Sequence, residues 1–400
     1  MLKTRDLLIE IGTEELPPKS LKSLATAFSE QMCLALNEVE LDFNDTNWYA
    51  TPRRLSLLIT DLDITQKDKK HQRRGPSLSV AFDKNKNPTQ ATAGFAKSCG
   101  VEVKELEKLE SGKGAWLVFN TILKGKKTNE IIPGLVEKSL GRLPIAKRMR
   151  WGNYNIEFVR PIKWILILFG NKTLNCEILG IKSGATSFGH RYHHPGALEI
   201  KSPSEYSNIL RNKGYVIVDY NERLSLIRSQ ISLAAKNSKG NAIIDPGLLD
   251  EVTSLVEWPV SFIGNFDPEF LKLPKEVLIA TMQDNQKYFP VTNDKKELMP
   301  LFVCVSNIES NNLELIKKGN ERVIRPRLSD AVFFWEWDLK YGLKNHRQSL
   351  KEVVYQKDLG TLYDKSERLV KTLSLIGEKI NLDIDSAKTA AALCLCDLLT

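Results

Sequence analysis

The sequence predicts an α+β protein that continues into an all-helical region, and two observations indicate this. Up to about residue 330, short apolar strands and amphipathic helices follow one another without a regular strand–helix–strand rhythm. From Leu328 to Thr400 almost every stretch is compatible with helix, with breaks near Gly342, Gly360 and 381–385. The change of pattern predicts two structurally different regions.

Length and composition agree with this division. The chain has 400 residues, 42% hydrophobic and 26% charged, which is ordinary globular composition and enough for two or three domains. We place a mixed α+β domain at residues 1–330, with a further division considered near residue 200. Residues 331–400 are expected to be the start of a helical domain. The sequence stops inside a periodic helix without a cap, so we expect the natural chain to continue beyond Thr400.

The individual elements follow from local patterns. The apolar run Asp6–Gly12 has the length and composition of a strand. Pro17 and Pro18 then open a helix, since proline is tolerated in the first turn. The basic polar stretch 66–74 is expected to be a loop or an edge. Further strands are expected at Arg54–Leu62, Trp116–Leu123, Pro161–Phe169, Leu174–Ile181, Val216–Val218, Val260–Ile263, Lys287–Val291 and Leu298–Ile308, and further helices at Gln90–Cys99, Thr128–Leu140, Glu205–Asn212, Glu222–Ala235, Leu248–Glu257 and Lys275–Met282.

Several enzyme classes lack their signatures in this sequence. There is no P-loop, no G-x-G-x-x-G after a strand, no H-E-x-x-H and no G-x-S-x-G. The five histidines and six scattered cysteines offer no metal-ligand spacing, so we expect no metal site and reduced thiols. The longest apolar run, Trp164–Phe169, is far shorter than the ~20 residues that a membrane span needs. These features predict a cytoplasmic protein without membrane contact.

Two short clusters each allow two interpretations. The run His190–His194 could be a metal site or a phosphate-contacting loop, but no ligand set completes it, and we favour a structural loop. The pair Glu14-Glu15 could serve acid–base chemistry. It also precedes the helix that begins with prolines, where negative charge complements the helix dipole. We favour this helix-capping interpretation.

Positive charge gathers in four patches. The chain carries +8 overall with a pI near 9.0, which permits an anionic partner but does not require one. The patches are Arg53-Arg54, Arg73-Arg74, the run 147–151 with Arg160 and Lys163, and the run 317–327. The third patch interleaves guanidinium groups with Trp151, Tyr154 and Trp164, which suits phosphate neutralisation beside a stacking surface. The alternative is a solvated edge over buried aromatic rings. The candidate phosphate contacts are Arg148, Arg150, Arg160, Arg322, Arg325 and Arg327.

Ordered strings along the whole chain resemble one family, the β chain of bacterial heterotetrameric glycyl-tRNA synthetase. The strings that carry the resemblance are Leu7–Pro17, Ala50–Leu55, Arg74–Pro76, Gly94–Ala96, Lys147–Gly152, Phe158–Trp164, Gly189–Arg191, His194-Pro195, Asp250–Pro259, Gln286–Pro290 and Gly319–Ala331, with a fainter match at Ala390–Thr400.

The resemblance implies a fold and a role. Residues 1–330 are expected to resemble the editing-type domain of the phenylalanyl-tRNA synthetase β chain, and the helices after them an HD-type domain. The enzyme is implied to contain two α and two β chains. The α chain is implied to use ATP and Mg and to form glycyl-adenylate, while the β chain helps to hold the glycine tRNA. No catalytic residue and no cofactor are then expected in this chain.

Two departures keep other functions open. The sequence ends before the region expected to recognise the anticodon, and its helical part has no His-Asp pair. One alternative is a hydrolase that clears mischarged tRNA near His190–His194, although a pocket for glycine can exclude larger amino acids sterically. The other is mainly a scaffold for the α chain, with the RNA contacts elsewhere.

Overall fold

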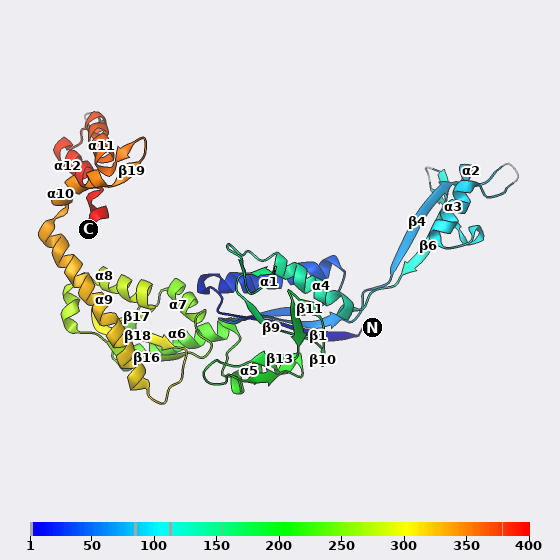
Figure 1. Ribbon diagram of the computed structural model, residues 1–400, viewed down its shortest axis with the longest axis horizontal. Helices are drawn as coiled ribbons and strands as arrows, with labels where there is room; N and C mark the ends of the chain where they lie inside the picture. Colours follow the sequence, from blue (N-terminus) through cyan, green and yellow to red (C-terminus); the bar gives the residue numbers. More distant parts are fainter. Residues whose placement is uncertain (1–2, 84–85, 112–113, 154, 378) are drawn as a thin grey trace. The chain divides into compact units, whose positions relative to one another are not determined.

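The computed structural model describes residues 3–83, 86–111, 114–153, 155–377 and 379–400. The chain forms two compact units (Figure 1). Unit 1 comprises Met1–Leu224 and Thr253–Trp258, and unit 2 comprises Ser225–Val252 and Pro259–Thr400. The chain therefore leaves unit 1, returns to it for a six-residue segment, and leaves again. Helices and several separate sheets occur together, which confirms the mixed α and β composition.

Unit 1 is built on a seven-stranded sheet with β1 at its centre. The strand order is β11-β12-β9-β1-β3-β2, and β10 pairs with β9. β1 pairs antiparallel with β3 and β9, while β12 runs parallel to β9. The strands are β1 (Thr4–Thr13), β2 (Asp45–Thr51), β3 (Arg54–Asp63), β9 (Ile162–Phe169), β10 (Lys172–Thr173), β11 (Glu177–Ile178) and β12 (Ile181–Gly184).

Both faces of this sheet are covered. Helices α1 (Pro18–Glu38) and α4 (Thr128–Gly141) pack on one face, against Leu7, Ile9 and Ile11 of β1. The opposite face, with Leu8, packs against α5 (Tyr206–Asn212) and its flanking segments. Figure 1 shows α1 and α4 along one side of the sheet and α5 on the other. Burial on both faces explains why β1 is almost continuously apolar.

Smaller elements complete unit 1. A three-stranded sheet has the order β4-β6-β5, so the basic strand β4 lies at its edge. Two short strand pairs, β7·β8 and β13·β14, lie elsewhere in the unit. These elements are β4 (Lys69–Ser77), α2 (Leu78–Ala81), α3 (Gln90–Cys99), β5 (Glu107–Ser111), β6 (Gly114–Leu123), β7 (Met149–Arg150), β8 (Glu157–Phe158), β13 (Thr186–Phe188) and β14 (Ala197–Glu199).

Unit 2 contains a four-stranded antiparallel sheet in the order β15-β17-β18-β16. Ile324 and Leu328 of the long helix α9 are buried in the same core as Phe262 and Phe302 of the sheet. Its elements are α6 (Tyr220–Asn237, which begins in unit 1), β15 (Asn241–Ala242), α7 (Pro246–Thr253), β16 (Val260–Asn265), α8 (Lys275–Ala280), β17 (Phe289–Thr292), β18 (Leu298–Ser306) and α9 (Leu313–Tyr341).

The C-terminal residues of unit 2 are mainly helical. They form α10 (Leu343–His346), α11 (Leu362–Gly377) and α12 (Ile384–Leu393). A short strand pair, β19 (Val354–Gln356) with β20 (Gly360–Thr361), interrupts the helices. A small core around Leu350, Leu362 and Cys396 holds this part together. Helix α9 continues through residue 330, where the pattern of the sequence changes, and the proposed domain limits stay a prediction.

Most expected elements are confirmed, and three expectations were wrong. Leu174–Ile181 is not one strand returning along β9, since turns at Leu179 and Gly180, both with positive φ, divide it. Val216–Val218 is buried but is no strand. The region after residue 328 is not helical throughout, because β19 and β20 lie within it. Residues 66–74, expected as a loop or an edge, contribute to the edge strand β4.

Candidate functional site

The most elaborate polar arrangement in the described part of unit 1 begins on the sheet face that α5 covers. Alternate residues of a strand point to opposite faces, so Glu10 and Gly12 share the face of Leu8. The strand register places Gly12 between Arg54 and Trp164. A Cβ atom at Gly12 would overlap the indole ring of Trp164. Glycine therefore lets Trp164 lie across β1, where its Nε1 donates a hydrogen bond to Glu10.

Glu10 is fully buried and is surrounded by donors. Besides Trp164, the hydroxyl of Ser187 donates to its Oε1 at 2.6 Å, and the hydroxyl of Tyr206 donates to its Oε2. Nη1 of Arg54 lies 3.9 Å from Oε2. A buried carboxylate is tolerated only when it is paired and hydrogen-bonded, and Glu10 meets both conditions.

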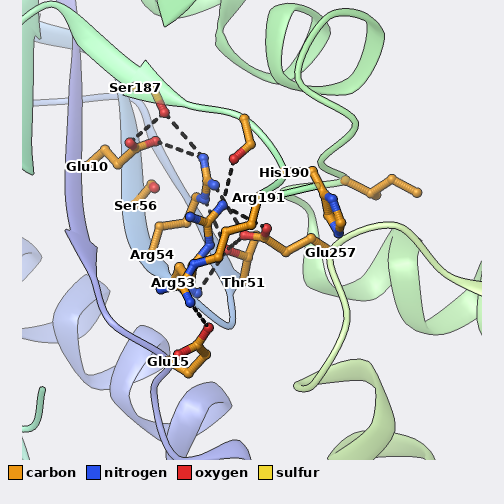
Figure 2. A network of polar contacts seen from close by, with 12 residues as sticks. Glu10, Glu15, Thr51, Arg53, Arg54, Ser56, Ser187, His190, Arg191 and Glu257 are labelled. Atoms are coloured by element: carbon orange, nitrogen blue, oxygen red, sulfur yellow. Dashed lines mark hydrogen bonds and ion pairs between the residues drawn. The ribbon is translucent and has the colours of Figure 1, made fainter. Parts of the chain in front are cut away.

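Arg54 is fully buried and uses each of its guanidinium nitrogens. Nε donates to Thr51 Oγ1 at 3.0 Å, Nη1 to Ser187 Oγ at 3.2 Å, and Nη2 to Glu257 Oε1 at 3.1 Å. The hydroxyl of Thr51 in turn donates to the same oxygen of Glu257 at 2.8 Å. Arg54 thus lies between two buried carboxylates, as Figure 2 shows.

Arg53 extends this arrangement to the next loop. Its Nη2 donates to Glu257 Oε2 at 3.1 Å and to the carbonyl of Gly189 at 2.6 Å. The positive charges of two guanidinium groups therefore balance the negative charges of two carboxylates in the interior (Figure 2). We call Glu10, Thr51, Arg53, Arg54 and Glu257 the buried network. It holds β1, β3 and the segment Thr253–Trp258 together within unit 1.

Opposite charges set the protonation states of the buried network. Burial by itself would raise the pKa of Glu257, but Arg54 and Arg53 outweigh burial, so the pKa lies below its ordinary value of 4.5. Burial would likewise lower the pKa of Arg54, and Glu257 and Glu10 raise it instead. Burial, reinforced by the charge of Glu10, raises the pKa of Tyr206 well above its ordinary value. Tyr206 therefore stays a neutral donor.

A second buried arginine fixes the segment Thr253–Trp258. The guanidinium of Arg223 donates to three backbone carbonyls, those of Thr253 at 3.1 Å, Ile217 at 2.5 Å and Ala50 at 2.7 Å. Burial lowers the pKa of Arg223 to about 10, so the group remains charged at neutral pH. Arg223 and the buried network thus attach the same segment to the edge of the sheet.

A shallow cleft of about 220 Å³ lies above the buried network. Its cationic lining residues are Arg53, Lys163 and Arg191, beside the rings of Trp164 and Phe188. The described lining residues include no carboxylate, thiol or imidazole. The cleft is thus lined by cationic side chains and aromatic rings.

Glu14 and Glu15 lie beside this cleft and do not cap α1, so the expected capping role was wrong. The helix begins after them, with Pro17 as its N-cap and no acidic residue in its first turn. Instead, Lys163 Nζ lies 3.1 Å from Glu14 Oε1, and Arg191 pairs with both glutamates. The hydrogen bond from Lys163 lowers the pKa of Glu14. Glu14 and Glu15 therefore neutralise Lys163 and Arg191, while Arg53 is paired with Glu257.

The histidine run forms a compact loop. His190 is buried, and its Nδ1 accepts hydrogen bonds from the backbone N–H groups of Tyr192 and His193, both at 3.2 Å. The ring of His193 packs against those of His190, Tyr192 and Tyr215. No group of metal-ligating side chains is found among the described residues. These contacts are those of a structural loop.

The structure divides the six candidate phosphate contacts between the two units. Arg148 and Arg160 are half-buried in unit 1, where they donate to backbone carbonyls, and Arg150 pairs with Glu157 at 2.7 Å. The side chains of Arg322, Arg325 and Arg327 are exposed on α9. Arg322 and Arg325, three positions apart, share one face of the helix. They line a cleft of about 520 Å³ with residues 265–268 and Glu321.

The remaining basic patches differ in accessibility. Arg54 is fully buried in the network, whereas Arg53 is largely buried but lines the cleft above it. Arg73 and Arg74 are exposed on β4. The stacking surface expected around Tyr154 cannot be described in full, because Tyr154 lies outside the described residues. Trp164 faces Glu10 and the cleft beside Arg53.

Comparison with known proteins identifies the family of this chain. A family model described as glycyl-tRNA synthetase beta subunit matches residues 7–400, almost the full chain. The chain belongs to the glycyl-tRNA synthetase β-subunit family. It is 48% identical over 396 residues to the glycine–tRNA ligase beta subunit of Hahella chejuensis, covering 99% of this chain and 57% of that protein. It is 46% identical over 400 residues to the corresponding subunit of Marinobacter nauticus, covering 100% and 58%.

The chain thus spans less than three-fifths of the length of these glycyl-tRNA synthetase β subunits. The matched range includes the entire buried network, the cleft above it and all six candidate arginines. In the described part of the chain, no helix has the length and apolar character to cross a membrane.

Glu10 and Glu257 of this β-subunit family member were not predicted from the sequence as partners of Arg54. A signal was present, since each is a lone carboxylate inside an apolar stretch, Leu7–Ile11 and Leu255–Trp258. A charged residue in such a position is almost never buried without a partner. The sequence identifies the need for a counter-ion, whereas only the fold shows that one arginine serves both carboxylates.

Proposed function

We propose that this chain serves as a glycine–tRNA ligase β subunit, which binds and orients the glycine tRNA while an α subunit carries the adenylation site. Membership of the β-subunit family over residues 7–400 is the observation that carries the proposal. The relatives are named β subunits, which supports the presence of an α partner. We propose an assembly of two α and two β chains. ATP and Mg are used by the holoenzyme through the α subunit, in the cytoplasm.

The contacts within unit 1 argue against a catalytic role for its charged side chains. The four charged groups of the buried network neutralise one another, and the imidazole of His190 is engaged with the backbone. The cations beside the cleft are paired with Glu14 and Glu15. We therefore assign no catalytic residue and no metal ligand to this chain.

The candidate tRNA contacts are Arg148, Arg150, Arg160, Arg322, Arg325 and Arg327. Arg322, Arg325 and Arg327 have the stronger support, because they are exposed and make no ion pair with another described residue. Guanidinium groups suit bidentate contact with phosphate. At the level of the fold, we propose an editing-type domain without hydrolytic activity, followed by the start of an HD-type helical domain.

Glycine-dependent charging of glycine tRNA tests this function. The reactions contain this chain alone, the α subunit alone, both together, and the α subunit with a full-length β subunit. Charging in both mixtures of an α and a β chain, and in neither single-chain reaction, is the expected result. Charging with full-length β but not with this chain would place the decisive tRNA contacts in the remaining part of the longer relatives. No charging with the full-length pair would contradict the assignment.

A deacylation assay separates the proposal from the hydrolase alternative. Mischarged tRNA is incubated with this chain, and free amino acid is measured. We expect no release above the rate without protein. Release that disappears on the change His190→Ala, with the fold retained, would overturn the assignment of a non-catalytic subunit.

A further inference from the structure

The net positive charge of the chain is concentrated in one short stretch. Residues 65–127 contain 14 Lys and Arg against six Asp and Glu, a difference of +8. The whole chain also carries +8, so the other residues together are neutral. We call residues 65–127 the basic arm. It comprises β4, β5 and β6 with the helices α2 and α3.

The described cations of the basic arm are accessible. Strand β4 is exposed from Lys69 to Arg74 and lies at the edge of its sheet. Only Lys67, Lys69 and Lys104 form ion pairs among the described residues of the arm. The exposed cations of the arm without an ion pair to a described residue are Lys70, Arg73, Arg74, Lys86, Lys97, Lys108, Lys124, Lys126 and Lys127.

The sheet of the basic arm adds stacking and hydrogen-bonding groups to this charge. The guanidinium carbon of Arg74 lies 3.5 Å from the centre of the Trp116 ring. The amide of Gln72 donates to Asn120 at 2.8 Å, and Asn120 donates to Glu107 at 2.9 Å, which links the three strands. A fixed guanidinium over an indole ring resembles the combination of charge and aromatic surface that binds nucleic acid.

Protection of an edge strand is the simpler explanation for part of this charge. Lysines on an edge strand prevent a second chain from adding to the sheet. That explanation accounts for Lys69 and Lys70 on β4. It does not account for Lys97 on α3, nor for the lysines at 124–127, which follow β6. The charge therefore extends over elements that have no exposed edge to protect.

We propose that the basic arm binds the phosphate backbone of RNA, with tRNA as the partner. The inference rests on the proposed function for the identity of the RNA, and it adds a contact surface outside the six arginines named above. Exposed Lys and Arg neutralise phosphates and release counter-ions, which gives affinity without base specificity. The arm contributes affinity and orientation, and not the recognition of glycine tRNA among other tRNAs.

A charge-matched comparison of two variants of the 400-residue chain tests this inference. In the arm variant, four lysines become glutamine: Lys70→Gln, Lys97→Gln, Lys124→Gln and Lys126→Gln. In the control variant, four exposed lysines elsewhere in unit 1 become glutamine: Lys172→Gln, Lys182→Gln, Lys201→Gln and Lys213→Gln. Both variants lose the same net charge, and none of the eight side chains has an ion pair with a described residue. The comparison therefore isolates the position of the charge.

Binding of fluorescent glycine tRNA is measured over a range of salt concentrations. For the arm variant, we expect the slope of log K against log salt to decrease by about 0.7–0.9 for each phosphate that the arm no longer neutralises. The control variant should retain the slope of the unchanged chain. The arm variant should show the same decrease in slope with a tRNA for another amino acid as with glycine tRNA, because phosphates carry no sequence information.

The inference would be overturned if the arm variant and the control variant changed the salt slope equally, or if the unchanged chain did not bind tRNA. It would also be overturned if the arm bound anionic phosphatidylglycerol vesicles and the chain did not bind tRNA. Charging in the presence of the α subunit is measured in parallel. Normal charging by the arm variant with unchanged tRNA affinity would remove the arm from RNA binding and leave the proposed function intact. Absence of charging by full-length β and α would instead contradict the proposed function itself.

Discussion

Nη2 of Arg54 lies 3.1 Å from Oε1 of Glu257, although 203 positions separate the two residues in the chain. Arg54 begins β3 of the central sheet, whereas Glu257 belongs to a segment that returns to unit 1 after α6 and α7. Their contact is fully buried and is shared with Glu10 and Arg53. The integrity of unit 1 therefore depends on a charged contact in its interior.

The change Arg54→Met should destabilise unit 1 strongly. It leaves the carboxylates of Glu10 and Glu257 buried, with Arg53 as the remaining cation. Breaking a buried ion pair by removal of one partner costs about 3–5 kcal/mol in the free energy of unfolding. Urea denaturation followed by tryptophan fluorescence measures this loss.

Arg150→Met is the matched control, since Arg150 pairs with Glu157 on the surface with 65% of its side chain exposed. Such a pair contributes at most about 1 kcal/mol. Similar losses in the free energy of unfolding for the two variants would show that the interior pair stabilises the protein no more than the surface pair does.

The contribution of Glu257 should depend on pH. Its pKa in the folded protein lies below the ordinary value of 4.5, because Arg54 and Arg53 outweigh the effect of burial. The unfolded chain therefore binds the proton more readily, and the stabilisation is present above pH 4.5 and decreases as the pH falls toward the folded value. The difference in free energy of unfolding between the unchanged chain and Glu257→Gln should be largest at neutral pH and should shrink as the pH falls below 4.5. A difference that stays constant from pH 7 to pH 3 would contradict this assignment.

A side chain at position 12 should disrupt the sheet. The change Gly12→Ala places a methyl group within the indole of Trp164, so the ring must move away from Glu10. Overpacking of this kind costs about 1–3 kcal/mol. Thermal unfolding monitored by circular dichroism measures the loss.

The change Gly94→Ala should stabilise the protein instead. Gly94 lies inside α3, where an added Cβ would meet no atom within 4 Å. Alanine in a helix interior is favoured over glycine by about 0.5–1 kcal/mol. If both changes destabilise the protein equally, the close approach of Trp164 to Gly12 is not what requires glycine there.

The cysteines should differ sharply in reactivity. Burial raises the pKa of Cys304, in β18, to about 12, so this thiol stays protonated at pH 8. Cys394 is exposed. Iodoacetamide at pH 8 should alkylate Cys394 well before Cys304, as measured by peptide mass spectrometry. In concentrated urea the two should react at similar rates, and faster labelling of Cys304 in the folded protein would contradict its burial.

Removal of the candidate arginines on α9 should weaken tRNA binding without altering its specificity. The triple change of Arg322, Arg325 and Arg327 to glutamine should reduce the salt slope by about 0.7–0.9 for each phosphate that is left without its guanidinium partner. The same measurement on Arg148, Arg150 and Arg160 should give a smaller change, because these side chains are engaged with Gly141, Glu157 and Glu15. An unchanged slope in both variants would exclude all six as phosphate contacts.

The sequence predicts the sheet better than it predicts the site. The apolar runs of β1, β3 and β9 and the proline-initiated helix α1 are local patterns, and each is confirmed. Local pattern could not show that Arg53 and Arg54, which look like a surface patch in the sequence, are buried against Glu257. The role of Glu14 and Glu15 was misassigned for the same reason, since their partners Lys163 and Arg191 are remote in sequence.

The return of the chain to unit 1 after α7 has a consequence for biosynthesis. At 5–20 residues per second, Arg54 is synthesised about 10–40 s before Glu257. During this interval the nascent β1 and β3 can pair, but the guanidinium of Arg54 lacks one of its two carboxylates. Unit 1 can reach its final form only after the segment Thr253–Trp258, which follows α7, has left the ribosome. A chain stalled before residue 257 would therefore be a preferred substrate for proteases and chaperones.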